Sequence, residues 1–253
     1  MTVCTSRRHR GRKETALPDK APSGSAANAV YYTSRAGVSA YSFYSLLKEE
    51  EYIFQRYFKP GDFVLDLACG LGRTTLLLHE MGVRVRGVDR SGVFIETANR
   101  RFPYLDLRVG SYDSIDEEDA SFAKILISLN GIDYAIPEEQ RVAALRECAR
   151  VLKPGGVLIF SSHNLKSLHW FSPYYRGKLR WKLRNVFRAF GTRCYIWDGP
   201  EYMLYTIPKY VVRQTESVGL KLLEVRGFNR FRSTRIDQYF SPYLQYVFTK
   251  PLP

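Results

Sequence analysis

Residues 64–73, VLDLACGLGR, and residues 85–89, VRGVD, decide the fold of this chain. In each stretch an apolar run ends in an acidic residue, and the first run continues through a glycine-rich turn into an apolar helical pattern. Gly70 and Gly72 carry no side chain, so backbone amides and a helix N-terminus can approach a ligand closely. Asp89 follows Gly72 by 17 residues, near the spacing that places a carboxylate on ribose hydroxyls. The two stretches therefore predict a βαβ unit that holds a nucleoside.

The acidic residue of the first stretch separates two kinds of nucleotide ligand. A dinucleotide fingerprint needs a third glycine at position 75, where this chain has Thr75. Asp66 precedes the glycines at the expected tip of a strand, where it would repel a pyrophosphate. S-adenosylmethionine carries an ammonium group and a sulfonium that tolerate Asp66, and a ribose for Asp89. These residues favour S-adenosylmethionine and disfavour an NAD-dependent oxidoreductase.

Length and composition indicate a globular chain. It has 253 residues, 45% of them hydrophobic, which is enough for one sizeable core. No run approaches the roughly 20 apolar residues of a membrane span, and the basic N-terminus lacks the apolar segment of a secretory signal. The four cysteines are widely spaced and show no metal-ligand pairing, so we predict no metal site and a reduced, cytoplasmic setting.

The net charge of +13 is concentrated in two segments. Residues 1–13 carry five basic side chains and residues 165–193 carry eight, and neither segment contains an acidic residue. Residues 1–29 lack periodicity and predict a disordered basic tail. Residues 174–190 predict an amphipathic helix. We interpret that helix either as a lid with a solvated basic face or as a surface for an anionic partner, such as lipid headgroups in a peripheral membrane contact, an acidic acceptor or nucleic acid.

Beyond the tail, apolar runs alternate with helical patterns, which predicts a doubly wound, mostly parallel sheet. The expected strands are 63–67, 83–88, 105–109, 124–129, 157–161, 220–226 and 243–249, and the expected helices are 38–58, 74–81, 93–101, 138–152 and 208–218. The run KPGG at 153–156 predicts a helix stop and a turn. We expect one α/β domain over residues 30–253, with seven strands, helices on both faces and a final antiparallel strand. An aromatic and basic insertion at 165–207 would cover the site.

Five motifs, in this order and spacing, resemble the class I S-adenosylmethionine-dependent methyltransferases. They are DLACGLG at 66–72, Asp89, GSYD at 110–113, SLN at 128–130 and LRECARVLKPGG at 145–156. The likeness is strong over about residues 60–163 and weak over 208–250. It implies a Rossmann-like fold, S-adenosyl-L-methionine as cofactor and methyl transfer as the reaction, and it is nearly silent on the methyl acceptor.

The resemblance also implies a role for each matching residue. The loop 66–72 would hold the methionine end of the cofactor, Asp89 both ribose hydroxyls, and Asp113 the adenine amine. Residues after the fourth strand would face the cofactor and the acceptor. The cofactor-binding residues implied in this way are Asp66, Ala68, Cys69, Gly70, Gly72, Arg73, Asp89, Arg90, Tyr112, Asp113, Asn130 and Ile132.

His163 and Asn164 are the candidate catalytic residues. His163 stands at the expected carboxyl end of the fifth strand, where open α/β sheets bind ligands, and its imidazole could accept a proton from a hydroxyl or amine acceptor. The alternative is a polar residue that is hydrogen-bonded to the strand end. Asn164 either orients an acceptor or caps a turn. We also expect three aromatic residues to face the acceptor: Tyr32, Tyr41 and Trp197.

We predict methyl transfer to an O or N atom of a small-molecule, glycan or lipid-linked acceptor. One alternative is an RNA or protein methyltransferase that docks its polymer on the two basic segments. The chain has Asn130-Gly-Ile-Asp133 where amino-methylating nucleic-acid enzymes carry an Asn/Asp-Pro-Pro-aromatic tetrad, which makes nucleic acid the less favoured partner. Another alternative is a non-catalytic scaffold that binds the cofactor without turnover.

Overall fold

The computed structural model describes residues 45–167, 194–198, 202–227 and 239–253. The predicted tail at 1–29, the predicted helix at 174–190, and the candidate acceptor residues Tyr32 and Tyr41 lie outside the described residues. Within the described ranges, no helix has the length and apolar character that a membrane crossing requires.

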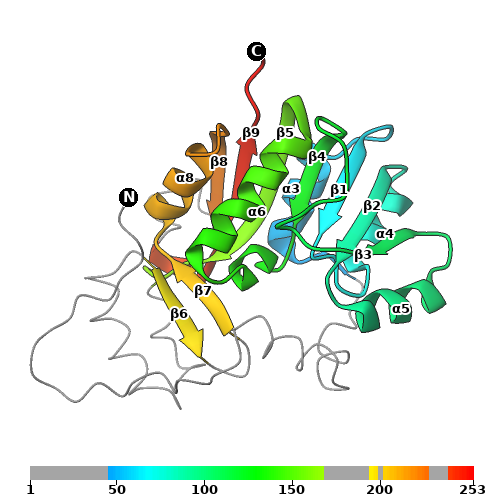
Figure 1. Ribbon diagram of the computed structural model, residues 1–253, viewed down its shortest axis with the longest axis horizontal. Helices are drawn as coiled ribbons and strands as arrows, with labels where there is room; N and C mark the ends of the chain where they lie inside the picture. Colours follow the sequence, from blue (N-terminus) through cyan, green and yellow to red (C-terminus); the bar gives the residue numbers. More distant parts are fainter. Residues whose placement is uncertain (1–44, 168–193, 199–201, 228–238) are drawn as a thin grey trace, which may run out of the picture.

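Seven strands form one sheet in the order β3-β2-β1-β4-β5-β9-β8 (Figure 1). Their bounds are β1 Phe63–Leu67, β2 Arg84–Asp89, β3 Asp106–Val109, β4 Phe122–Ile127, β5 Leu152–His163, β8 Lys221–Gly227 and β9 Tyr243–Thr249. The neighbouring strands from β3 to β5 pair in parallel, whereas β9 runs antiparallel to both β5 and β8. The predicted sheet of seven strands with an antiparallel final strand is therefore confirmed.

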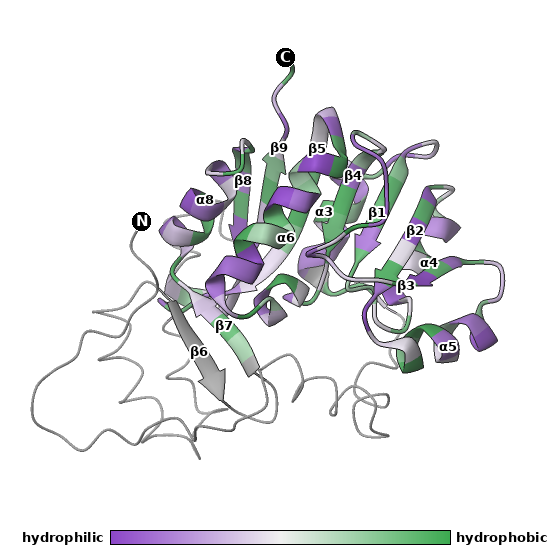
Figure 2. Cartoon of the chain, in the orientation of Figure 1, coloured by the Kyte–Doolittle hydropathy of each residue, from purple (hydrophilic) through white to green (hydrophobic). Residues whose placement is uncertain are grey.

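Helices cover both faces of this sheet. The described residues contain α3 Lys48–Tyr57, α4 Arg73–Glu80, α5 Gly92–Arg101, α6 Glu138–Val151, α8 Pro208–Glu216 and the 3-10 helix η1 Gly131–Tyr134. Successive side chains of a strand point to opposite faces. Accordingly, Leu65 joins the core under α6 and α8, while Val64 joins the core under α3 and α4. Figure 2 shows the strands coloured mainly as hydrophobic between helices that carry hydrophilic stretches.

The run KPGG differs from its prediction. Helix α6 ends at Val151, but β5 starts at Leu152 and continues through these residues instead of starting after a turn. The pairing register between β4 and β5 shifts at this point, and Gly155 has a φ of +75°. Its N–H donates to the Lys250 carbonyl at 2.8 Å, so the chain that follows β9 supplies a partner and the glycines form an irregular strand.

Part of the predicted insertion at 165–207 forms a hairpin. Strands β6 Cys194–Asp198 and β7 Tyr202–Thr206 pair antiparallel to each other and form a separate two-stranded sheet. Strand β7 packs against β5 and η1, and the N–H of Leu165 donates to the carbonyl of Thr206 at 3.2 Å. The insertion therefore returns to the carboxyl end of β5, next to His163.

Candidate active site

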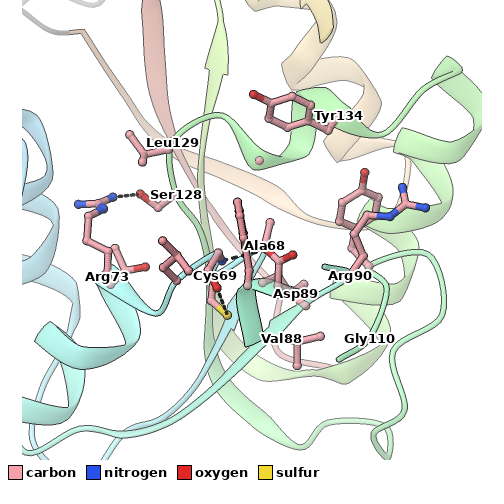
Figure 3. A pocket seen from close by; sticks show the side chains of 17 residues that line it. Ala68, Cys69, Arg73, Val88, Asp89, Arg90, Gly110, Ser128, Leu129 and Tyr134 are labelled. Atoms are coloured by element: carbon pink, nitrogen blue, oxygen red, sulfur yellow. Dashed lines mark hydrogen bonds between the residues drawn. The ribbon is translucent and has the colours of Figure 1, made fainter. Parts of the chain in front are cut away.

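A cavity opens at the carboxyl ends of β1, β2 and β4, where open α/β sheets bind ligands (Figure 3). Its empty space, counted with the open mouth, is about 840 Å³. Four segments line it, namely the loop after β1, the end of β2 with the start of α5, the loop after β3 and the turn after β4. The lining residues are Leu67, Ala68, Cys69, Gly70, Leu71, Arg73, Thr74, Val88, Asp89, Arg90, Phe94, Gly110, Tyr112, Ser128, Leu129, Gly131 and Tyr134.

The loop after β1 brings backbone next to the cavity. Gly70 and Gly72 have φ values of +58° and +80°, and Ala68 adopts the same left-handed region at 55°. Only glycine enters this region without steric cost, which explains the glycines at 70 and 72 and makes Ala68 a strained position. Helix α4 begins directly after Gly72, so its N-terminus and the loop amides lie beside the cavity.

Asp89 connects the end of β2 to this loop. One carboxylate oxygen accepts the Gly70 N–H at 2.9 Å, and the other accepts the Ser91 N–H at 2.8 Å. Burial raises the pKa of Asp89, while these two N–H donors and the charge of Arg90 lower it. Each carboxylate oxygen has a further lone pair, and Asp89 lines the cavity, so it retains acceptors for two ligand hydroxyls.

Asp66 lies beneath the loop and does not line the cavity. It is fully buried, and its Oδ2 atom accepts the hydroxyls of Thr74 and Thr75, each at 2.7 Å. Burial raises its pKa to about 6, although the two hydroxyls and the charge of Arg73 lower it. In this position Asp66 fastens the first turn of α4 to the end of β1.

Arg73 joins three elements at the cavity wall. Its guanidinium donates to both carboxylate oxygens of Glu50 at 2.6 and 2.7 Å, to the hydroxyl of Ser128 at 2.7 Å and to the carbonyl of Ser45 at 3.0 Å. Figure 3 shows its bond to Ser128 across the cavity edge. The ion pair is buried and connects α3 to the start of α4 and the end of β4. Sequence reasoning missed Glu50, which lies 23 residues before Arg73.

The remaining residues implied by the resemblance divide into two groups. Cys69, Arg90 and Tyr112 line the cavity together with the loop. Asp113 lies outside the lining, where it accepts the Gln140 amide at 2.8 Å and the Ser111 hydroxyl, and these bonds lower its pKa. Gly72, Asn130 and Ile132 are also outside the lining, and Ile132 is part of the core between the sheet and α6.

His163 lies at the end of β5 and contacts the buried carboxylate of Asp133, a residue that sequence reasoning missed. The Oδ2 atom of Asp133, on η1, accepts the backbone N–H of His163 at 2.6 Å and lies 2.9 Å from its ring atom Nδ1. The other ring nitrogen, Nε2, is 3.5 Å from the Asn130 amide nitrogen. Tyr205 of the hairpin stacks on the imidazole with ring centroids 4.5 Å apart. In the sequence, Asp133 is marked only by its position, as an acidic residue shortly after the fourth predicted strand.

Asp133 belongs to a buried polar network. The other oxygen of its carboxylate lies 3.1 Å from the Arg141 guanidinium and accepts the Ser162 hydroxyl at 2.7 Å, and the side chains of both ion-pair partners are 0% exposed. Arg141 also donates to the Ser162 hydroxyl at 3.0 Å and to the Thr206 hydroxyl at 3.1 Å. The network therefore links η1, α6, β5 and the hairpin beneath His163.

Asn164 occupies the turn that follows β5. It is fully buried, its side-chain oxygen accepts the Lys166 N–H at 3.0 Å, and its amide donates to the Ser241 carbonyl at 3.0 Å. These contacts are those of a turn cap. Trp197 lies on β6, opposite Met203, and its side chain is not among those described. In the described part of the chain, no group of three His, Cys, Asp or Glu side chains is arranged to hold a metal ion.

The parallel sheet, the glycine loop and the carboxylate at the end of β2 define a nucleoside-binding protein of the Rossmann-like class. A family profile described as a methyltransferase domain matches residues 64–156. Ubiquinone biosynthesis O-methyltransferase of Coxiella burnetii is 28% identical over 195 residues, which are 71% of this chain and 72% of the relative. Cypemycin N-terminal methyltransferase of a Streptomyces species is 36% identical over 97 residues, 38% of this chain and 40% of the relative.

Solved structures agree on the fold. A crystal structure of a SAM-dependent methyltransferase from Methanosarcina mazei matches 79% of this chain and 98% of its own, with a TM-score of 0.60 at 20% identity. The chain therefore carries a match to the methyltransferase domain family over residues 64–156, and the relatives and solved structures together support a class I S-adenosylmethionine-dependent methyltransferase. It is accordingly a methyltransferase, and S-adenosyl-L-methionine is its cofactor.

Proposed function

We propose that this enzyme methylates a hydroxyl oxygen or an amine nitrogen of a small molecule and that His163 accepts the proton that the acceptor loses. The observation that carries the proposal is the pair of contacts from Asp133 to His163, at 2.6 Å to the backbone N–H and 2.9 Å to Nδ1. These contacts leave Nε2 as the ring nitrogen that can take a proton. His163 lies at the carboxyl edge of the sheet that also holds the cavity.

The residues that line the cavity support its assignment as the cofactor site. Asp89 would accept the two ribose hydroxyls, and the amides of the loop around Gly70 would face the methionine end. The apolar side chains of Val88 and Phe94, with the ring of Tyr112, would flank the adenine. Asp113 lies outside the lining but directly follows Tyr112, which is part of it, and would accept the adenine amine through the lone pairs that Gln140 and Ser111 leave free.

The chemistry required of the protein is modest because the methyl group arrives activated. When bound, the cofactor supplies a methyl carbon to which an acceptor lone pair forms a bond while the carbon–sulfur bond breaks and sulfur keeps its electrons. The Nε2 atom of His163 takes the proton from the acceptor oxygen or nitrogen, which gives a neutral product. Positioning and exclusion of water supply the rest of the acceleration.

The two curated relatives support this class of acceptor. One is named for O-methylation in ubiquinone biosynthesis, and the other for methylation of a peptide N-terminus. Both kinds of group lose a proton when they are methylated, and a base near neutral pH serves both. We therefore propose that the acceptor carries a hydroxyl or an amine, and a small molecule is the better-supported form because that relative aligns over more of this chain.

The test has two stages. Methyl-labelled S-adenosylmethionine is incubated with pools of phenols, aliphatic alcohols and primary amines, and the labelled product is identified by mass. His163→Gln is then compared with His79→Gln, an exposed histidine on α4. We expect His163→Gln to lower kcat by roughly 10²- to 10⁴-fold and to leave the affinity for S-adenosylhomocysteine unchanged. Unchanged kcat, or cofactor binding without turnover in any pool, would contradict the proposal.

A further inference from the structure

We propose that Asp133 positions His163, by holding its imidazole in the tautomer that carries hydrogen on Nδ1 and a lone pair on Nε2. The inference deepens the proposed function and rests on it, because it concerns how the proposed proton acceptor is held. Asp133 is a positioning residue in this arrangement and touches neither acceptor nor cofactor.

The tautomer follows from the atoms around Oδ2 of Asp133. This oxygen accepts the His163 backbone N–H at 2.6 Å and lies 2.9 Å from Nδ1. An ionised carboxylate can only accept hydrogen bonds, so Nδ1 must carry the hydrogen. Nε2 then has the lone pair, and the Asn130 amide donates weakly to it at 3.5 Å. An acceptor hydroxyl or amine can replace so long a bond.

The remaining contacts of Asp133 pair its carboxylate and fix its position. Arg141 and Ser162 both donate to Oδ1, at 3.1 and 2.7 Å, so the second oxygen also acts as an acceptor. A buried carboxylate needs such partners, because an unpaired charge in the interior is strongly disfavoured. Tyr205 stacks on the face of the His163 imidazole and limits its rotation.

Few other ionisable groups face this histidine from the described elements packed around it. Tyr134 lies on η1 beside Asp133, and Tyr205 lies on β7. On β9, Tyr243 is the register partner of His163 and donates its hydroxyl to Glu49. The Asp133 carboxylate and the Arg141 guanidinium are therefore the charged groups of this network, and the carboxylate is the one bonded to the ring.

The arrangement also defines the acceptor more narrowly. The Asn130 amide whose nitrogen lies 3.5 Å from Nε2 also carries Oδ1, a buried oxygen with no hydrogen-bond partner among the described residues. Nε2 and this oxygen are both hydrogen-bond acceptors, and they fit a neutral group that donates, namely a hydroxyl or an amine N–H. They do not fit a carboxylate or a thiolate, which has no hydrogen to donate.

A spectroscopic experiment tests the tautomer without any acceptor. In the full chain bound to S-adenosylhomocysteine, the ¹⁵N shifts of His163, assigned with His163→Gln, should show a protonated Nδ1 and an unprotonated Nε2 in the neutral ring. Asp133→Asn should change this pattern. Ser162→Ala, which removes a donor to Asp133 but touches no ring atom, should preserve it. A hydrogen on Nε2 in the wild-type protein overturns the inference even if Asp133→Asn does not fold.

The rate of methyl transfer to the acceptor that the pool experiment identifies gives the second readout. We expect Asp133→Asn to lower kcat about 10-fold or more, with the acceptor KM within about 3-fold, because the acceptor still binds while the proton acceptor is no longer held. Asp133→Glu should recover part of the loss. If His163→Gln is inactive while Asp133→Asn keeps the wild-type kcat, this inference fails and the proposed function stands.

Discussion

Two aspartates at neighbouring strand ends show how environment assigns a role to a residue. Asp66 and Asp89 both follow apolar strands and both looked like ligand-binding carboxylates in the sequence. In the structure Asp89 lines the cavity with spare lone pairs, whereas Asp66 is fully buried on two threonine hydroxyls. We therefore infer that Asp89 binds the cofactor, whereas Asp66 stabilises the loop after β1.

The raised pKa of Asp66 makes a prediction about stability. Its folded-state pKa of about 6 exceeds the ordinary value of 3.8, because burial disfavours the carboxylate. Between these pH values the folded protein therefore holds one more proton than the unfolded protein. The contribution of the Asp66 carboxyl to the free energy of unfolding is fully present below about pH 4 and is lost as the pH rises through 6. Asp66→Asn, which stays neutral, should be more stable than wild type at pH 8, by up to about 3 kcal/mol.

Urea unfolding from pH 4 to pH 8 measures this difference. The gap between Asp66→Asn and wild type should be small at pH 4 and should widen up to pH 7. Asp106→Asn is the matched control on β3, because Arg86 and Arg108 lower the pKa of that partly exposed carboxyl. Its effect should have the opposite sign and should fade as the pH falls. A gap for Asp66→Asn that does not vary with pH contradicts the account.

At the scale of elements, the buried pair of Glu50 and Arg73 attaches α3 to the cofactor loop. Removal of one partner leaves a charge without compensation in the interior, which typically costs about 3–5 kcal/mol. We expect Glu50→Ala to lower the free energy of unfolding by this order. Because Arg73 lines the cavity, the same change should weaken S-adenosylhomocysteine binding. Chemical denaturation and calorimetry measure the two effects.

An exposed pair provides the comparison for Glu50. Glu96 and Arg100 on α5 are i, i+4 neighbours with 69% of each side chain exposed and 3.2 Å between the charged atoms. Such surface pairs contribute about 0.3–0.5 kcal/mol, so Glu96→Ala should change stability little and cofactor affinity not at all. Equal losses in Glu50→Ala and Glu96→Ala would show that the buried pair does not attach α3 to the loop.

Local sequence patterns predicted most elements well, and long-range contacts explain the exceptions. The bounds of β1 and β9 match their predicted ranges, and β2, β3 and β8 differ by one residue at one or both ends. The irregular start of β5 depends on Lys250, far along the chain, which no local pattern reveals. The hairpin of β6 and β7 was not predicted as a unit, because it is stabilised by packing on β5 and η1.

At the scale of the whole molecule, the sheet order brings distant motifs to one edge. Parallel strands β1, β2 and β4 end at the same side of the sheet (Figure 1). The glycine loop, Asp89 and Ser128 therefore meet around one cavity. The resemblance predicted the cofactor-binding residues of this site from short motifs. Glu50, Asp133 and Arg141 could not be predicted, because each acts through partners on other elements and stands in no motif.

The central claim is that the cavity beside Asp89 holds S-adenosylmethionine, and calorimetric titration with S-adenosylhomocysteine tests it most directly. Asp89→Asn removes a charged acceptor of two hydroxyls, each such bond contributing about 1.5–3 kcal/mol. We expect its affinity to fall on the order of 10- to 100-fold or more, with Asp106→Asn unchanged. Wild-type affinity in Asp89→Asn would contradict the account.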